Sequence, residues 1–72
     1  MTEWNEKARE LKNKVKTAKT KADAVEIANE AIENRAEFMI SDGAFRTIVS
    51  LLFWKSLINE EELDEIKRSI RA

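Results

Sequence analysis

The sequence contains no cysteine, histidine or tyrosine. Without cysteine, the chain can form neither a disulfide nor a thiolate zinc site. The three missing residue types also supply many of the general acids, bases and nucleophiles of enzymes, and the four serines have no imidazole to activate them. The carboxylates lack the Glu-x-x-His pairs that bind metals in helical bundles. We therefore expect no enzymatic activity, no catalytic residue, no bound metal and no cofactor.

Proline is also absent, and glycine occurs once, at Gly43. Both residues interrupt helices and build tight turns, so their scarcity predicts long helices and disfavours a fold of strands and turns. The most apolar stretch, residues 44–58, is shorter than the roughly 20 residues that a membrane-spanning helix needs, and it is interrupted by polar side chains. We therefore expect no membrane association.

Candidate helix N-caps divide the chain, and they are Thr2, Thr20, Ser41 and Asn59. An acidic residue follows both Thr20 and Asn59 three positions later, which is the spacing of a capping box. The sequence thus predicts an all-α fold, with residues 1–72 forming one domain, a small bundle of four helices in which the third is central. The predicted helices span residues 3–18, 21–40, 42–57 and 60–70.

Apolar residues recur at helical spacing in each predicted segment. The first helix has a narrow stripe, made of Trp4, Ala8, Leu11, Val15 and Ala18. The second has a broader face, made of Val25, Ala28, Ala31, Ile32, Ala36 and Met39 and flanked by Ile27 and Phe38. The fourth is expected to bury Leu63, Ile66 and Ile70.

The stripes of the first two segments share one unbroken heptad phase, which runs from Trp4 to Met39 and includes Asn29. One long helix in a coiled coil would show the same pattern. We favour a break at residues 19–21, because the charge changes there from the basic type found at helix C-termini to the acidic type found at N-termini.

The third segment is apolar almost all round, although only a few other helices are available to bury it. Phe45, Ile48, Val49 and Leu52 form its main apolar face, while Trp54 falls on the polar stripe, four residues after Ser50. Trp and Arg are enriched at binding hot spots. We therefore predict an interface with a protein partner or a second copy, made of Arg46, Ser50, Phe53, Trp54 and Leu57. The alternative is that the first helix covers Trp54.

Charge is unevenly distributed along the chain, although the net charge is −1. Residues 1–21 carry seven basic and three acidic side chains. An alternative function is therefore regulation by nucleic-acid binding through Lys7, Lys12, Lys14, Lys16, Lys19 and Lys21. We favour an ordinary solvated surface, with some lysines facing acids of the second helix, because no aromatic residue is interleaved to stack on bases.

Residues 22–42 carry one basic and six acidic side chains. Five of the acids follow one side of the predicted second helix, and they are Asp23, Glu26, Glu30, Glu33 and Glu37. This stripe is either a solvated helix face or a docking face for a basic partner.

The segment from Leu52 to Ile70 resembles the short C-terminal domain known as SHOCT. In that family a helix ends in Gly and is followed by Leu or Ile, Thr, acidic residues, Phe and Lys. The matching residues here are Leu57, Ile58, Glu60, Glu61, Glu62 and Lys67, with Ser56, Asn59 and Leu63 replacing the Gly, Thr and Phe. The whole chain also resembles small helical proteins of phages and mobile elements of Gram-positive hosts. The resemblance implies a role in oligomerisation or interaction.

Together these patterns predict a small regulator or inhibitor that acts as a homodimer or by binding a host protein. It would have no small-molecule substrate, and a protein is favoured over nucleic acid as its partner. Since neither an export signal nor cysteine is present, we expect a cytoplasmic location, in a bacterial host if the chain derives from a phage. A designed or purely structural bundle is a further alternative, although Asn29 in the apolar stripe and Trp54 on a polar one disfavour it.

Overall fold

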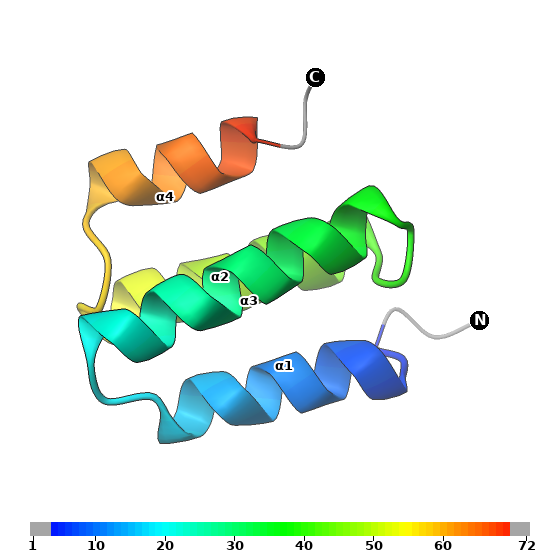
Figure 1. Ribbon diagram of the computed structural model, residues 1–72, viewed down its shortest axis with the longest axis horizontal. Helices are drawn as coiled ribbons and strands as arrows, with labels where there is room; N and C mark the ends of the chain where they lie inside the picture. The colour runs from blue at the N-terminus through cyan, green and yellow to red at the C-terminus, as the bar shows by residue number, and fades with distance from the viewer. Residues whose placement is uncertain (1–3, 70–72) are drawn as a thin grey trace.

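The computed structural model describes residues 4–69, and within them the chain forms four α-helices and no strand. The helices are α1 (Glu6–Thr17), α2 (Lys21–Ala36), α3 (Asp42–Trp54) and α4 (Glu60–Arg68) (Figure 1). The all-α prediction is confirmed. The prediction of a break between the first two helices is also confirmed, because residues 18–20 are not helical.

The N-terminal starts of α2, α3 and α4 are those predicted from their caps. The Thr20 side chain accepts a hydrogen bond from the backbone N–H of Asp23, and the Asp23 carboxylate accepts one from the N–H of Thr20. Asn59 and Glu62 form the same reciprocal box. The predicted start of α1 is wrong, because Asn5 caps this helix instead. Thr2, the predicted cap, lies outside the described residues.

The predicted C-terminal ends of α1, α2 and α3 run one to four residues too far. Helices α2 and α3 end in turns that are usually built with glycine but form here without it. Phe38 and Ser56 follow the caps with φ angles of 59° and 61°. In both turns the next N–H donates back to a carbonyl of the last helical turn, Met39 to Asn34 at 2.8 Å and Leu57 to Leu52 at 3.1 Å. This is the Schellman arrangement, whose left-handed position normally holds glycine. The predicted end of the fourth helix, Ile70, lies outside the described residues.

Substitution of Ser56 by glycine is expected to stabilise the fold. A left-handed conformation costs an L-residue about 1–2 kcal/mol, and glycine loses roughly 0.5–1 kcal/mol more in conformational freedom on folding. We expect the free energy of unfolding to rise by about 0.5–1 kcal/mol, as measured by urea denaturation. Ser50→Gly, within α3, is the matched control and should lower it by a similar amount. A Ser56→Gly variant less stable than the native protein would contradict this reading of the turn.

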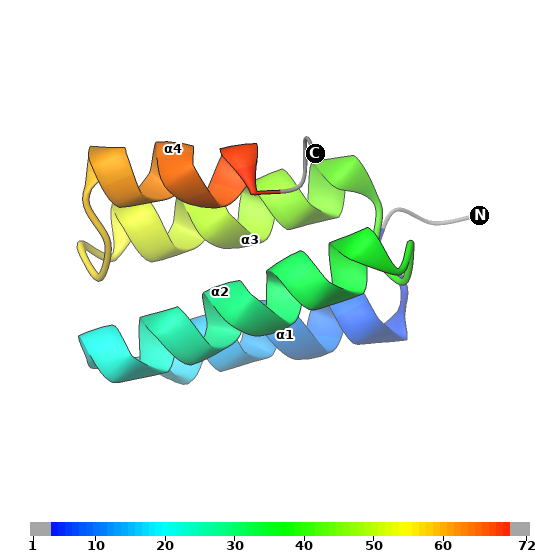
Figure 2. The ribbon, with the colours of Figure 1, turned by 45° about the horizontal axis from the view of Figure 1, so that its top comes forward.

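Helix α3 packs against α1, α2 and α4, so the predicted central position of the third helix is confirmed (Figure 2). The molecule measures 31 × 28 × 16 Å along its principal axes. The fully buried residues of α3 are Phe45, Ile48, Val49 and Leu52. Helix α1 contributes Ala8, Leu11 and Val15 to the same core. The core is therefore organised around the side chains that the sequence placed on the main face of the third helix.

The predicted buried face of α2 is partly wrong. Val25 and Met39 are 46% and 50% exposed, Phe38 is 82% exposed, and Ala36 is also exposed. Ala28, Ala31 and the flanking Ile27 are buried as predicted, and Ala24 is buried in addition. The side of α2 that faces the core therefore carries mainly small alanine side chains, and the larger Val25 is exposed. The heptad phase shared with the first helix therefore does not correspond to one continuous buried face.

Candidate interaction site

The exposed side of α3 carries three of the predicted contact residues in one line. Arg46, Ser50 and Trp54 are four residues apart, a spacing that places side chains on one face of a helix. Trp54 is 77% exposed, so the alternative in which α1 covers it is wrong. Arg46 is exposed and Ser50 is half-buried. We call these three residues, together with Phe53 and Leu57, the Trp54 face.

Phe53 and Leu57 join this line to the core at its C-terminal end. The Phe53 ring is half-buried and meets the Trp54 ring edge to face, with the centroids 6.1 Å apart and the planes at 75°. Leu57 is also half-buried and lies in the connection to α4. A shallow depression beside Trp54 is lined by both residues and reaches Lys21 and Glu62, which form an ion pair. An aromatic side chain in solvent thus lies next to both apolar and charged contacts.

At the N-terminal end of the Trp54 face, Arg46 forms an ion pair. The Arg46 guanidinium lies 2.9 Å from the Asp42 carboxylate one turn earlier, and Arg35 of α2 approaches the same carboxylate at 3.8 Å. All three side chains remain partly exposed. Exposed pairs of this kind contribute little to stability, so the pairing orients Arg46 rather than anchoring α3.

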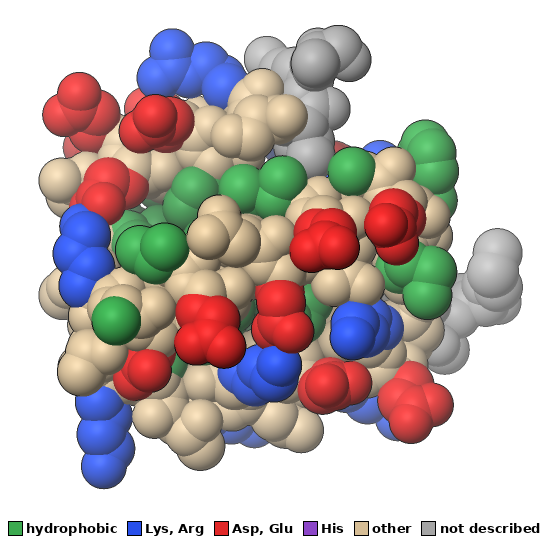
Figure 3. All heavy atoms as spheres, in the orientation of Figure 1, with side chains coloured by type: hydrophobic (Ala, Val, Ile, Leu, Met, Phe, Trp, Pro, Cys, Tyr) green, Lys and Arg blue, Asp and Glu red, His purple; other side chains and the backbone are tan. Residues whose placement is uncertain are grey.

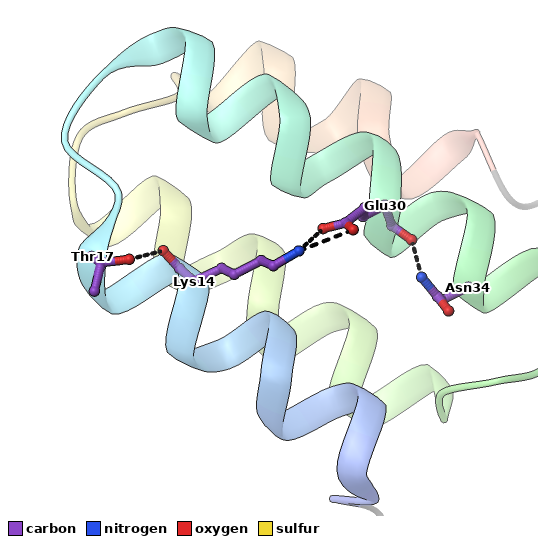
Figure 4. A network of polar contacts seen from close by, with 4 residues as sticks. All are labelled: Lys14, Thr17, Glu30 and Asn34. Carbon is purple, nitrogen blue, oxygen red and sulfur yellow. Dashed lines mark hydrogen bonds and ion pairs between the residues drawn. The ribbon is translucent and has the colours of Figure 1, made fainter.

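The six candidate nucleic-acid-binding lysines do not lie on one surface. Lys14 points to α2, where its Nζ donates to both Glu30 oxygens at 3.0 and 2.8 Å (Figure 4). Lys12 lies over the Trp4 ring, 4.9 Å from the centroid, and Lys21 pairs with Glu62 of α4. The remaining three are Lys7, which is half-buried, and Lys16 and Lys19, which are exposed. This arrangement disperses the basic charge over several sides of the molecule.

The predicted acidic docking face is divided in a similar way. The Asp23 carboxylate accepts hydrogen bonds from the backbone N–H groups of Lys19 and Thr20, and Glu30 pairs with Lys14, so both already have partners within the chain. Glu26, Glu33 and Glu37 are exposed. Within residues 4–69, these three are the members of the predicted stripe whose carboxylates have neither an ion pair nor a capping hydrogen bond.

Within residues 4–69, two carboxylates have lowered pKa values. Backbone N–H groups of Lys19 and Thr20 lower the pKa of Asp23, and the Lys21 side chain followed by the Asn59 N–H lowers that of Glu62. The Glu30 carboxylate raises the pKa of Lys14 through a hydrogen bond. A lowered carboxylate pKa stabilises the folded state above its unfolded value of about 4 and ceases to do so as the pH falls through the folded value. The stabilisation from Lys14 is retained until the pH rises above about 10.

We therefore expect the free energy of unfolding to fall as the pH drops from about 5 to 3. The double variant Asp23→Asn, Glu62→Gln should be less stable than the native chain at pH 7 and should show a shallower fall below pH 5. Urea midpoints measured at several pH values test this. Glu61→Gln, which removes an exposed carboxylate of α4, is the matched control and should keep the native fall. If the free energy of unfolding of the double variant fell below pH 5 as steeply as that of the native chain, other groups would be responsible for the loss of stability in acid.

Sequence reasoning missed the role of Lys55. Its Nζ donates to three carbonyl oxygens at the end of α1, those of Val15 at 2.7 Å, Lys16 at 3.0 Å and Ala18 at 2.8 Å. A helix C-terminus has unpaired carbonyls and a partial negative charge, so an ammonium group there is stabilising. Lys55 thus holds the Trp54 end of α3 against the C-terminal end of α1.

Within residues 4–69, no group of three or more acidic side chains is arranged to hold a metal ion. The helices in this part of the chain are also too short or too polar to cross a membrane. Comparisons with models of protein families, with curated proteins and with solved structures each find no match.

Proposed function

We propose that this chain is a small protein–protein interaction module, and that the Trp54 face contacts a second copy of the chain. The observation that supports this most directly is the 77% exposure of Trp54, a residue type enriched at hot spots, beside Phe53 and the oriented Arg46. Burial of a large aromatic ring against a partner would remove substantial apolar surface from water. A host protein with a similar apolar surface is the alternative partner.

Two further features support a contact role over an enzymatic one. The chain has no histidine or cysteine, and the depression beside Trp54 is shallow. The resemblance of residues 52–70 to SHOCT domains, and of the whole chain to small phage and mobile-element proteins, suggests the same kind of role. In that setting the module would act as a regulator or inhibitor.

Because the chain has no cysteine, one introduced thiol reports on proximity between copies. We expect Ser50→Cys to give a covalent dimer with a short bismaleimide linker at micromolar protein concentration. Asp64→Cys, on the exposed side of α4, is the matched control and should give far less dimer. Equal cross-linking of the two variants would indicate random collision and would count against contact through the Trp54 face.

A further inference from the structure

A second surface, separate from the Trp54 face, lies between α2 and α4. Helix α4 packs mainly on α3, which leaves a groove of about 220 Å³ beside α2. Its floor is apolar and includes Val25 and Ile32 of α2 and Ile66 of α4, with Ile58 at its base. We call this surface the α2–α4 groove. Hydrophobic side chains gather along it in the space-filling view (Figure 3).

The groove contains Val25, Asn29 and Ile32, which belong to the heptad stripe of the second helix. Ala22 and Ala36 continue this stripe at intervals of three and four. Ala22, Val25, Asn29 and Ala36 are exposed, and Ile32 is half-buried. A stripe with this spacing is suited to packing against another helix. Within residues 4–69, no helix of the chain covers it fully.

Both rims of the α2–α4 groove are acidic. Glu33 follows Ile32 along α2 and is exposed, while Glu65 lines the α4 side. Glu26 faces the depression between α1 and α2 instead. Acidic side chains of both helices flank the apolar seam in the space-filling view (Figure 3). Lys21 pairs with Glu62 at one end, so it neutralises one acid of the α4 rim and leaves Glu65. Excess negative charge on both sides of an apolar floor restricts which ligands can bind.

We infer that the α2–α4 groove binds a basic amphipathic helix of a protein partner. Apolar side chains of that helix, spaced three and four residues apart, would contact Val25, Ile32 and Ile66, and its Lys or Arg residues would face the acidic rims. A second copy of this chain would bring the same acidic rims together, and nucleic acid or an anionic membrane would be repelled. The volume of the groove is below the range of about 300–1,000 Å³ that is usual for small-molecule pockets. The groove is therefore better suited to a few anchoring side chains of a helix than to a small molecule.

The probe is a fluorescein-labelled 16-residue peptide with Leu at helical three- and four-residue spacing and Lys elsewhere, titrated by fluorescence anisotropy. We expect it to bind the native protein, and a peptide with Glu in place of Lys to show no binding. Val25→Glu and the double variant Glu33→Lys, Glu65→Lys should each weaken binding at least tenfold. The double variant Glu10→Lys, Asp64→Lys makes the same change in net charge at exposed sites away from the groove and should retain native affinity.

Absence of binding by the native protein would overturn the proposal. Equal weakening in the two double variants would also overturn it, because it would show attraction to net charge alone. Trp54→Glu separates this inference from the proposed function. It should leave peptide affinity unchanged while it abolishes self-association, so either surface can fail without the other.

Discussion

Replacement of Phe45 by alanine is expected to leave most of the protein unfolded at room temperature. Phe45 is fully buried in α3, and the core around it draws on all four helices of residues 4–69. Truncation of a buried Phe costs about 3–5 kcal/mol, and a core of this size seldom supplies more than about 3–5 kcal/mol in total. Far-UV circular dichroism with urea denaturation, at a protein concentration low enough to avoid self-association, gives the measurement.

Trp54→Ala is the matched control, since it removes a larger aromatic side chain from the same helix. Exposed substitutions usually change stability by about 0.5 kcal/mol or less, so we expect a loss below about 1 kcal/mol. The contrast between the two variants tests the division of α3 into a buried and an exposed side. Comparable losses in both would show that Trp54 belongs to the core.

The second large effect is expected for Lys55→Met. This change keeps much of the aliphatic stem and removes the ammonium group that donates to three carbonyls of α1. A hydrogen bond to a charged group contributes about 1.5–3 kcal/mol, but the lost bonds are partly replaced by water because Lys55 is exposed. We expect the free energy of unfolding to fall by about 1–2 kcal/mol, with a lower urea midpoint and an unchanged slope.

Lys19→Met is the control for this prediction, because it removes an exposed lysine in the α1–α2 connection. We expect it to change stability by less than about 0.5 kcal/mol. Hydrogen exchange adds a local readout. Loss of Lys55 should speed exchange at the C-terminal turn of α1 more than in α4. If Lys55→Met matched the native protein in both measurements, the contacts of Lys55 would not stabilise the fold.

The starts of α2, α3 and α4 were predictable from the sequence because their signals are local, whereas the start of α1 was not. Thr20 with Asp23, and Asn59 with Glu62, form reciprocal bonds over three residues, so the residues that carry the signal also form the contact. The helix ends were less predictable. Phe38 and Ser56 adopt left-handed conformations that usually indicate glycine, and the sequence offers no glycine at either position.

The buried face of α2 could not be derived from apolar spacing alone. The larger side chains Val25 and Ile32 define a clear stripe, whereas the chain buries Ala24 beside the predicted Ala28 and Ala31, and the small size of these alanines matters only once α1 and α3 are in place. The prediction of the contact residues depended on the position of Trp54 on the polar stripe of its helix, and its exposure agrees with that position. Lys55 was missed because its carbonyl partners lie 37–40 residues away in the sequence.

The molar mass in solution, measured by light scattering over a concentration series, tests contact through the Trp54 face most directly. The native chain is compared with Trp54→Glu and with Phe38→Glu, which makes the same change at an exposed aromatic residue beyond the other end of α3. We predict that the native chain and Phe38→Glu reach twice the chain mass as concentration rises, while Trp54→Glu stays folded and monomeric. A native chain that is monomeric throughout, or a dimer that only Phe38→Glu dissociates, would contradict the proposed interface.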